Sequence, residues 1–141
     1  MSNYNNIVNI VDNELKTALL IYNALCTIWG INLFQFADAV KALVHLKINR
    51  KDYAVMISDL RMPDITGVRL LKAVKDLNPL ARTNLMTAYE IDDNLIQEYS
   101  KKEIINSFLK KPIELTLLPS EVNKQVCSIE KKYVDSLLRR K

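Results

Sequence analysis

Apolar runs alternate along this chain with segments in which apolar residues recur every three or four positions. Strands are predicted at 7–11, 33–37, 53–58, 83–88 and 107–109, and the run at 53–58 is apolar nearly throughout, as in strands covered on both faces. The segments between and after them show helical spacing. Because each connection between parallel strands needs a crossover, five strands alternating with five helices predict an α/β fold with a parallel sheet.

The predicted helices differ in how clear their apolar faces are. The first helix ends at Gly30, and its apolar stripe is Leu15, Leu19, Tyr22, Leu25 and Trp29. The second helix is capped by Asp38, and its stripe is Val40, Leu43, Val44 and Ile48. The stripe of the third helix is Val68, Leu71, Val74 and Leu77. The fourth is expected at Ile91–Lys102 with a weaker pattern, and the last begins near Leu115.

The last helix continues beyond what the sheet requires. Its apolar residues step by four and three positions through Leu118, Val122, Val126, Ile129, Tyr133 and Leu137. From Val122 onwards this row is a candidate seam for a homodimer or for a stalk towards an output domain. The alternative is a solvent-facing extension whose first half packs on the sheet. We assign 1–126 to the main domain and 127–141 to a C-terminal helical extension.

Composition favours one globular domain. The chain has 141 residues, of which 49% are hydrophobic and 26% charged, and its two cysteines have no metal-type spacing. Residues 17–37 carry no charge, but polar residues interrupt them, so we predict a buried helix followed by a strand rather than a membrane span. The N-terminus lacks a signal sequence. We therefore expect a cytoplasmic protein with no membrane partner.

The net charge is +4, with basic residues grouped at 101–111 and 131–141. Such groups are most often solvated helix faces, so direct binding of nucleic acid is not expected.

Polar side chains follow four of the predicted strands. Asp12, Asn13 and Glu14 follow the first strand, Asp59 the third, Thr87 ends the fourth, and Lys111 follows the fifth. Parallel strands bring their carboxyl ends to one edge, where ligands bind. Acidic groups gathered there repel one another unless a cation joins them, and oxygen ligands suit Mg²⁺.

A carboxylate beside such a cation is a nucleophile towards phosphorus. Asp59 is our candidate, and Lys111 and the cation would neutralise the charge of the phosphoryl group. The Thr87 hydroxyl could donate a hydrogen bond to it. Pro112 favours an extended backbone at Lys111, or a cis peptide bond, and so directs the ammonium group.

Four segments in this order resemble the receiver domain of bacterial-type two-component response regulators: IVDNE at 10–14, SDLRMPDITG at 58–67, MTA at 86–88 and FLKKPI at 108–113. The resemblance covers roughly Asn6 to Val126. It implies a doubly wound, flavodoxin-like (βα)5 fold with strand order 2-1-3-4-5. It also implies a regulatory phospho-acceptor rather than an enzyme, phosphorylated with Mg²⁺ by a sensor histidine kinase or phosphotransfer protein.

The same resemblance assigns roles to single residues. Asp59 matches the phospho-acceptor, Asp12 an acid-pocket position, Thr87 (followed by Ala88) the switch hydroxyl, Lys111 the phosphate-contacting lysine and Phe108 the aromatic switch. The implied metal ligands are Asp12, Asn13, Asp59 and the backbone carbonyl of Arg61. Phosphorylation is then expected to alter protein contacts through the surface of helix four, strand five and helix five, towards a downstream partner or an output domain.

The second residue of the first motif departs from the family, which usually has two adjacent acids where this chain has Asp12 and Asn13. An amide oxygen can coordinate a cation but brings no charge, so weaker metal binding is expected. A phosphate-independent scaffold with the same fold therefore stays open as an alternative. A phosphohydrolase with an aspartate nucleophile would need a second acid two residues after Asp59, where Arg61 stands. His45, the only histidine, is not expected to bind metal or carry phosphate.

Overall fold

The computed structural model describes residues 5–88 and 94–139. Its sheet contains β1 (Ile7–Val11), β2 (Asn32–Phe36), β3 (Tyr53–Asp59), β4 (Arg82–Thr87) and β5 (Ser107–Lys110). All neighbouring strands are parallel, and their order is β2-β1-β3-β4-β5. The predicted fold class and strand order are therefore confirmed.

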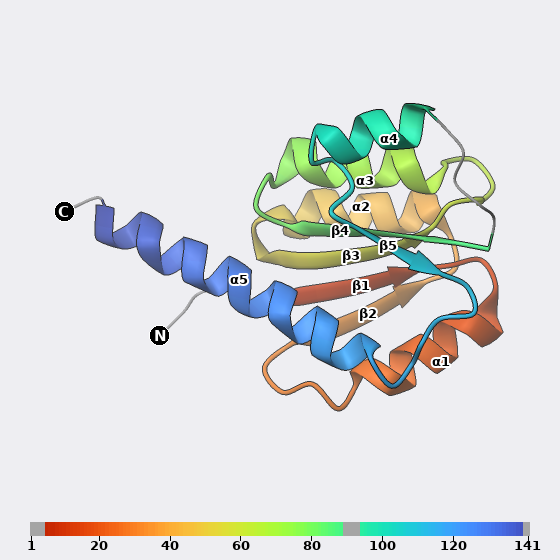
Figure 1. Cartoon of the computed structure of the whole chain (residues 1–141), viewed down its shortest axis with the longest axis horizontal. Helices are drawn as coiled ribbons and strands as arrows, with labels where there is room; N and C mark the ends of the chain where they lie inside the picture. Colours follow the sequence, from red (N-terminus) through yellow and green to blue (C-terminus); the bar gives the residue numbers. More distant parts are fainter. Residues whose placement is uncertain (1–4, 89–93, 140–141) are drawn as a thin grey trace.

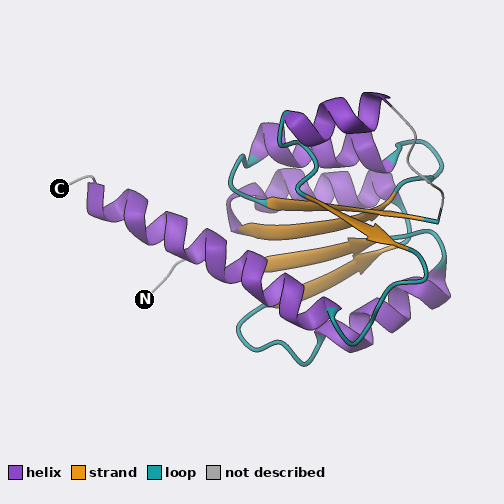
Figure 2. Ribbon diagram, viewed as in Figure 1, coloured by secondary structure: helices purple, strands orange, loops and turns teal. Residues whose placement is uncertain are grey.

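The helices form two layers around this sheet. They are α1 (Leu15–Leu25), α2 (Ala39–Asn49), α3 (Gly67–Leu77), α4 (Asn94–Lys101) and α5 (Leu118–Arg139), with a short 3-10 helix, η1 (Arg50–Asp52), before β3. In Figure 1, α2, α3 and α4 cover one face, and α1 and the first half of α5 cover the other. Figure 2 shows the sheet between the two layers. One hydrophobic cluster fills each space between sheet and helices.

Several boundaries differ from the sequence prediction. β2 and β4 each begin and end one residue earlier than expected. The last helix begins at Leu118 rather than near Leu115, with Pro119 in its first turn, where a missing N–H costs nothing. The predicted start of the fourth helix, Ile91, lies outside the described residues. Residues 17–37 form most of α1 and all of β2, and within the described ranges no helix is both long and apolar enough to cross a membrane.

The predicted buried face of α1 is confirmed at Leu25 and Tyr22 and wrong at its other positions. The residues that contact the core are Ala18, Ile21 and Leu25, whereas Leu15 and Leu19 are exposed. The helix also ends at Leu25, which leaves Trp29 of the predicted stripe 97% exposed. Because α1 is apolar on more than one side, periodicity alone does not decide which side faces the sheet.

The buried face of α2 was predicted correctly only at Leu43, which packs against the core. Ala39, Ala42 and Leu46 are buried, while Val40, Val44 and Ile48 point outwards. Small alanine side chains let the helix backbone approach the sheet closely, so packing favours them over the larger valines. The expected cap is confirmed, since Oδ1 of Asp38 accepts a hydrogen bond from the backbone N–H of Val40 at 2.8 Å.

The long α5 helix contacts the sheet and then continues beyond it, as Figure 1 shows. Val122, Val126 and Ile129 are at most 4% exposed and belong to the core of their own chain. They are therefore not available as a seam with a second copy, and that part of the prediction is wrong. Tyr133 is half-buried and Leu137 is 45% exposed, so the outer half of the seam stays a prediction. The division of the chain into 1–126 and 127–141 also stays a prediction.

One polar contact joins α5 to the sheet inside the apolar interface. The side-chain amides of Asn84 on β4 and Gln125 on α5 are both buried and exchange two hydrogen bonds of 2.9 Å. Nε2 of Gln125 also lies 3.4 Å from a carboxylate oxygen of Glu121. Apolar contacts have little directionality, whereas this pair has only one good geometry, so it helps to fix how α5 is placed on β4.

A second polar cluster lies between the sheet and α2. The Tyr53 hydroxyl accepts a 2.8 Å hydrogen bond from Nδ2 of Asn9 and is also hydrogen-bonded to Nδ1 of His45. The His45 ring packs against Phe34, with ring centroids 4.4 Å apart. Burial raises the pKa of Tyr53 to about 12 and lowers the pKa of His45. His45 is thus a packed, hydrogen-bonded side chain of α2.

Candidate functional site

Asp12 stands directly after β1 at the carboxyl edge of the sheet. Its side chain is fully buried, and Oδ1 accepts a 2.9 Å hydrogen bond from the backbone N–H of Glu14. Its own backbone N–H donates to the carbonyl oxygen of Phe36 on β2 at 3.1 Å, so the position is held by the sheet. One carboxylate is therefore fixed at this edge.

Asp59 is the last residue of β3, and its side chain is 14% exposed. Oδ1 accepts a 3.0 Å hydrogen bond from the backbone N–H of Leu60. The following loop returns closely, because the backbone N–H of Gly67 donates to the Leu60 carbonyl oxygen at 2.9 Å. A Cβ atom at position 67 would lie 2.0 Å from the Asp59 carbonyl oxygen. Only glycine permits α3 to begin this close to the Asp59 main chain.

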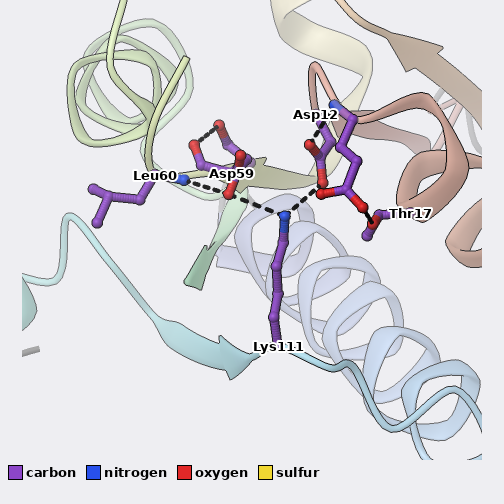
Figure 3. Close-up of polar contacts among 7 residues, drawn as sticks. Asp12, Thr17, Asp59, Leu60 and Lys111 are labelled. Carbon is purple, nitrogen blue, oxygen red and sulfur yellow. Dashed lines mark hydrogen bonds and ion pairs between the residues drawn. The ribbon is translucent and has the colours of Figure 1, made fainter. Parts of the chain in front are cut away.

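Lys111 brings the two carboxylates together. Its Nζ atom lies 3.0 Å from Oδ2 of Asp12 and 3.3 Å from Oδ1 of Asp59, as Figure 3 shows. Its backbone N–H donates to the carbonyl oxygen of Thr87 at 2.9 Å, which ties the end of β5 to the end of β4. The Lys111–Pro112 peptide bond is cis, one of the two geometries expected. Side chains from three strand ends thus meet, as the sequence predicted.

The site holds more negative than positive charge, since one ammonium group faces two carboxylates. Burial raises the pKa of Asp59 and the charge of Asp12 raises it further, while Lys111 acts in the opposite direction. Burial alone would lower the pKa of Lys111, but the hydrogen bonds and charges of the two carboxylates outweigh it and raise this pKa. An additional cation would relieve the repulsion that remains.

The donor atoms at this site are oxygens, as Mg²⁺ prefers, but together they carry only two negative charges. Asp12 and Asp59 offer carboxylate oxygens, and the exposed residues Asn13 and Arg61 lie directly after Asp12 and two positions after Asp59. Within 5–88 and 94–139, no group of three or more His, Cys, Asp or Glu side chains is arranged to hold a metal ion. Two carboxylates, an amide and a backbone carbonyl would be an oxygen-only set with one charge fewer than three acids provide.

The remaining predicted residues lie at the edges of this site. Thr87 is at the carboxyl end of β4 and only 3% exposed, and Ala88 beside it is exposed. Phe108 on β5 is 40% exposed and lines a surface hollow of about 480 Å³ between β5 and α5, together with Ile113 and Leu117. Phe108 therefore belongs to an outer surface rather than to the carboxylate cluster.

Two positions that shape the site were not identified from the sequence. The backbone N–H of Leu60 binds the Asp59 carboxylate, and Gly67 sets how closely α3 follows. A signal for Gly67 was present, since it is one of only two glycines and ends the loop after Asp59. No side-chain pattern reports a backbone donor such as the one at Leu60.

Comparison with known proteins agrees with this geometry. The profile of the family described as "Response regulator receiver domain" matches residues 8–123. The curated relatives include the transcriptional regulatory protein ZraR of Klebsiella oxytoca, 26% identical over 77% of this chain and 24% of its own length. Another is the DNA-binding transcriptional regulator NtrC of Escherichia coli K12, 28% identical over 77% and 22%. The chain spans about a quarter of the length of these relatives.

Solved structures show the same likeness. The receiver domain of the Francisella response regulator 1452 superposes with a TM-score of 0.69 at 27% identity, covering 86% of this chain and 97% of that one. The receiver domain of nitrogen regulatory protein C gives 0.72 at 26% identity, covering 87% and 95%. Since the family profile matches most of the chain and the Asp12–Asp59–Lys111 cluster stands where its motifs predict, the chain belongs to the response regulator receiver domain family.

Proposed function

We propose that this chain is a cytoplasmic phospho-accepting switch in which Asp59 is phosphorylated in the presence of Mg²⁺. The observation that supports this most directly is the Lys111 ammonium group, held within 3.3 Å of both the Asp12 and the Asp59 carboxylates. Members of this family are regulatory phospho-acceptor domains rather than classical enzymes. The donor would be a sensor histidine kinase or a phosphotransfer protein.

The proposed reaction is a phosphoryl transfer to a carboxylate. An Asp59 carboxylate oxygen attacks the phosphorus of a phosphohistidine, the new O–P bond forms as the P–N bond breaks, and the imidazole leaves with the electron pair. Lys111 remains beside the phosphoryl oxygens and neutralises part of their charge, and the Thr87 hydroxyl donates a hydrogen bond to them. Asp12, Asp59, Asn13 and the Arg61 carbonyl would hold Mg²⁺, which would supply further neutralisation of the phosphoryl charge.

The output is proposed to leave through the surface of α4, β5 and α5. Phe108 and the hollow beside it lie on this surface, where an apolar partner side chain could bind. The curated relatives are named as transcriptional regulators and are about four times as long as the matched region. A downstream protein or an attached output domain would read the switch in this chain.

A second candidate is a phosphate-independent scaffold, and Asn13 is the observation that favours it. With an amide in place of the second acid, two carboxylates already shared with Lys111 would have to bind the cation. A variant that restores the acid, Asn13→Asp, separates the two functions.

The experiment is phosphorylation by acetyl phosphate or phosphoramidate with Mg²⁺, followed by intact-protein mass spectrometry. The switch predicts a single phosphoryl adduct on the wild-type chain, none on Asp59→Asn, and faster labelling of Asn13→Asp at low Mg²⁺. If only Asn13→Asp is labelled, even at high Mg²⁺, the wild-type chain is a scaffold. If neither is labelled while both stay folded, the proposed chemistry is wrong.

A further inference from the structure

The outer side of α2 carries a row of aliphatic side chains. Val40, Val44 and Ile48 are spaced four residues apart and are 42%, 52% and 76% exposed. Residues at this spacing follow one another along one side of a helix. Single exposed aliphatic residues are common on protein surfaces, whereas contiguous exposed apolar surface is typical of interaction sites.

The charges around this row are mixed but mostly basic, since Asp52 in η1 follows Ile48 at the same spacing. No acidic residue occurs in α2 from Ala39 to Asn49, and the exposed Lys41 and Lys47 lie beside the row. Lys51 follows in η1 and is also exposed. At the start of the helix, the Asp38 carboxylate is engaged as the helix cap.

The neighbouring helix α3 also exposes basic residues. α3 packs beside α2 in the same layer (Figure 1) and exposes Arg69 and Lys72. Its exposed acid, Asp76, lies 3.2 Å from Lys72 and is partly neutralised by it. A partner that covers the α2 row would therefore meet aliphatic surface with Lys41 and Lys47 beside it.

We propose that this α2 face, defined by Val40, Val44 and Ile48 with Lys41 and Lys47, docks an acidic amphipathic helix of a partner protein. Such a helix presents apolar anchors every three or four residues, which match the row, and carries Asp or Glu beside them, which match the lysines. This inference rests on the fold of α2 alone and not on phosphorylation of Asp59.

Other occupants fit the surface less well. A second copy that bound symmetrically through the same face would bring the lysines of one copy close to the lysines of the other, and their like charges would repel. A nucleic acid would need hydrogen-bond donors for its phosphates over the whole contact surface, whereas the side chains at the centre of this row are aliphatic and offer none. Helices that lie on membranes usually carry Trp, Phe or Leu on the apolar side, and this row contains only Val and Ile.

The test uses the whole chain and two synthetic helical peptides that share one leucine row. One peptide has Glu and the other Lys beside this row. Titration into ¹⁵N-labelled protein, followed by amide chemical shifts, should show saturable changes along α2 with the Glu peptide only. Val44→Asp should weaken the binding by at least about tenfold, since it puts a carboxylate in the centre of the row. Leu20→Asp, which changes a 48%-exposed leucine on the opposite layer, is the matched control and should bind like wild type.

Several results would overturn the proposal. These are an absence of α2 shifts up to millimolar Glu peptide, equal binding of the Lys peptide, or equal weakening by the Leu20→Asp control. The proposal also fails if α2 resonances respond to protein concentration, anionic phosphatidylserine vesicles or duplex DNA instead of the Glu peptide. Both substituted side chains are exposed, so we expect each variant to fold. The amide spectrum of each variant checks this directly.

Discussion

Replacing Lys111 with methionine should destabilise the fold at neutral pH much more than the same replacement at Lys110. The Lys111 ammonium lies 3.0 Å from one oxygen of the fully buried Asp12 and 3.3 Å from one of Asp59. Methionine keeps most of the apolar volume and removes the charge. Two largely buried carboxylates would then face each other without a cation. Lys110, the last residue of β5 and the neighbour of Lys111, is exposed and serves as the matched control.

The size of the effect follows from these distances. Coulomb's law with an effective dielectric constant near 20 gives about 5 kcal/mol of attraction for each contact, of which desolvation cancels a large part. Removing one partner of a fully buried pair typically costs about 3–5 kcal/mol. Because the side chains of Lys111 and Asp59 are 15% and 14% exposed, solvent screens part of this. We expect a loss of about 2–3 kcal/mol for Lys111→Met and less than about 0.5 kcal/mol for Lys110→Met.

The loss should depend on pH. The pKa of Asp59 is already raised by burial and by Asp12, and Lys111 opposes this rise, so the substitution should raise it further. A carboxyl group with a higher pKa in the folded than in the unfolded state reduces stability as pH rises from the unfolded to the folded pKa. The deficit of Lys111→Met should therefore be greatest at neutral pH and should shrink as pH falls towards about 4, the ordinary pKa of Asp.

The measurement is urea-induced unfolding of wild type and both variants at several pH values between neutrality and mild acid, without added Mg²⁺. Equal losses for Lys110→Met and Lys111→Met would refute the reasoning, because the charge cluster would then contribute nothing specific. A Lys111→Met deficit that is the same at both ends of the pH range would show that lost packing, rather than uncompensated charge, causes it.

Three further predictions concern other parts of the molecule. In urea unfolding, Gln125→Met and Asn84→Leu should each cost about 1–3 kcal/mol by leaving a buried amide unpaired, whereas the double variant should cost less than the sum; additive losses would contradict the paired-amide geometry. Gly67→Ala should cost about 3 kcal/mol or more and slow phosphorylation of Asp59, because the new Cβ would meet the Asp59 carbonyl oxygen; a normally stable, normally labelled variant would show that the loop shifts freely. Because burial lowers the pKa of His45, the folded state binds its proton less readily than the unfolded state, so unfolding free energy should fall as pH drops through about 6; His45→Gln should remove this part of the slope.

Much of the candidate site could be predicted because its residues mark strand ends. Asp59 and Thr87 are the last residues of β3 and β4, and Asp12 and Lys111 directly follow β1 and β5. The rule that parallel strands end at one edge brings such residues together whatever the loops do. The hydrogen bond from Leu60 and the close approach at Gly67 could not be predicted in the same way, because both depend on the path of the main chain after β3.

The sequence by itself determined the alternation of strands and helices, the parallel sheet and the identity of the charged residues at its edge, because these follow from local periodicity and from the order of elements. The predicted apolar face of α3 was right, since Val68, Leu71 and Val74 are buried, but only the tertiary structure decided which sides of α1 and α2 face the sheet. On α2 the small residues Ala39 and Ala42 turn inwards and Val44 outwards, since close packing depends on the space left by the sheet. Tertiary structure also placed Lys111 3.0 Å from Asp12, 99 residues away in sequence. A distance of that kind is set by the whole sheet and cannot be read from either segment.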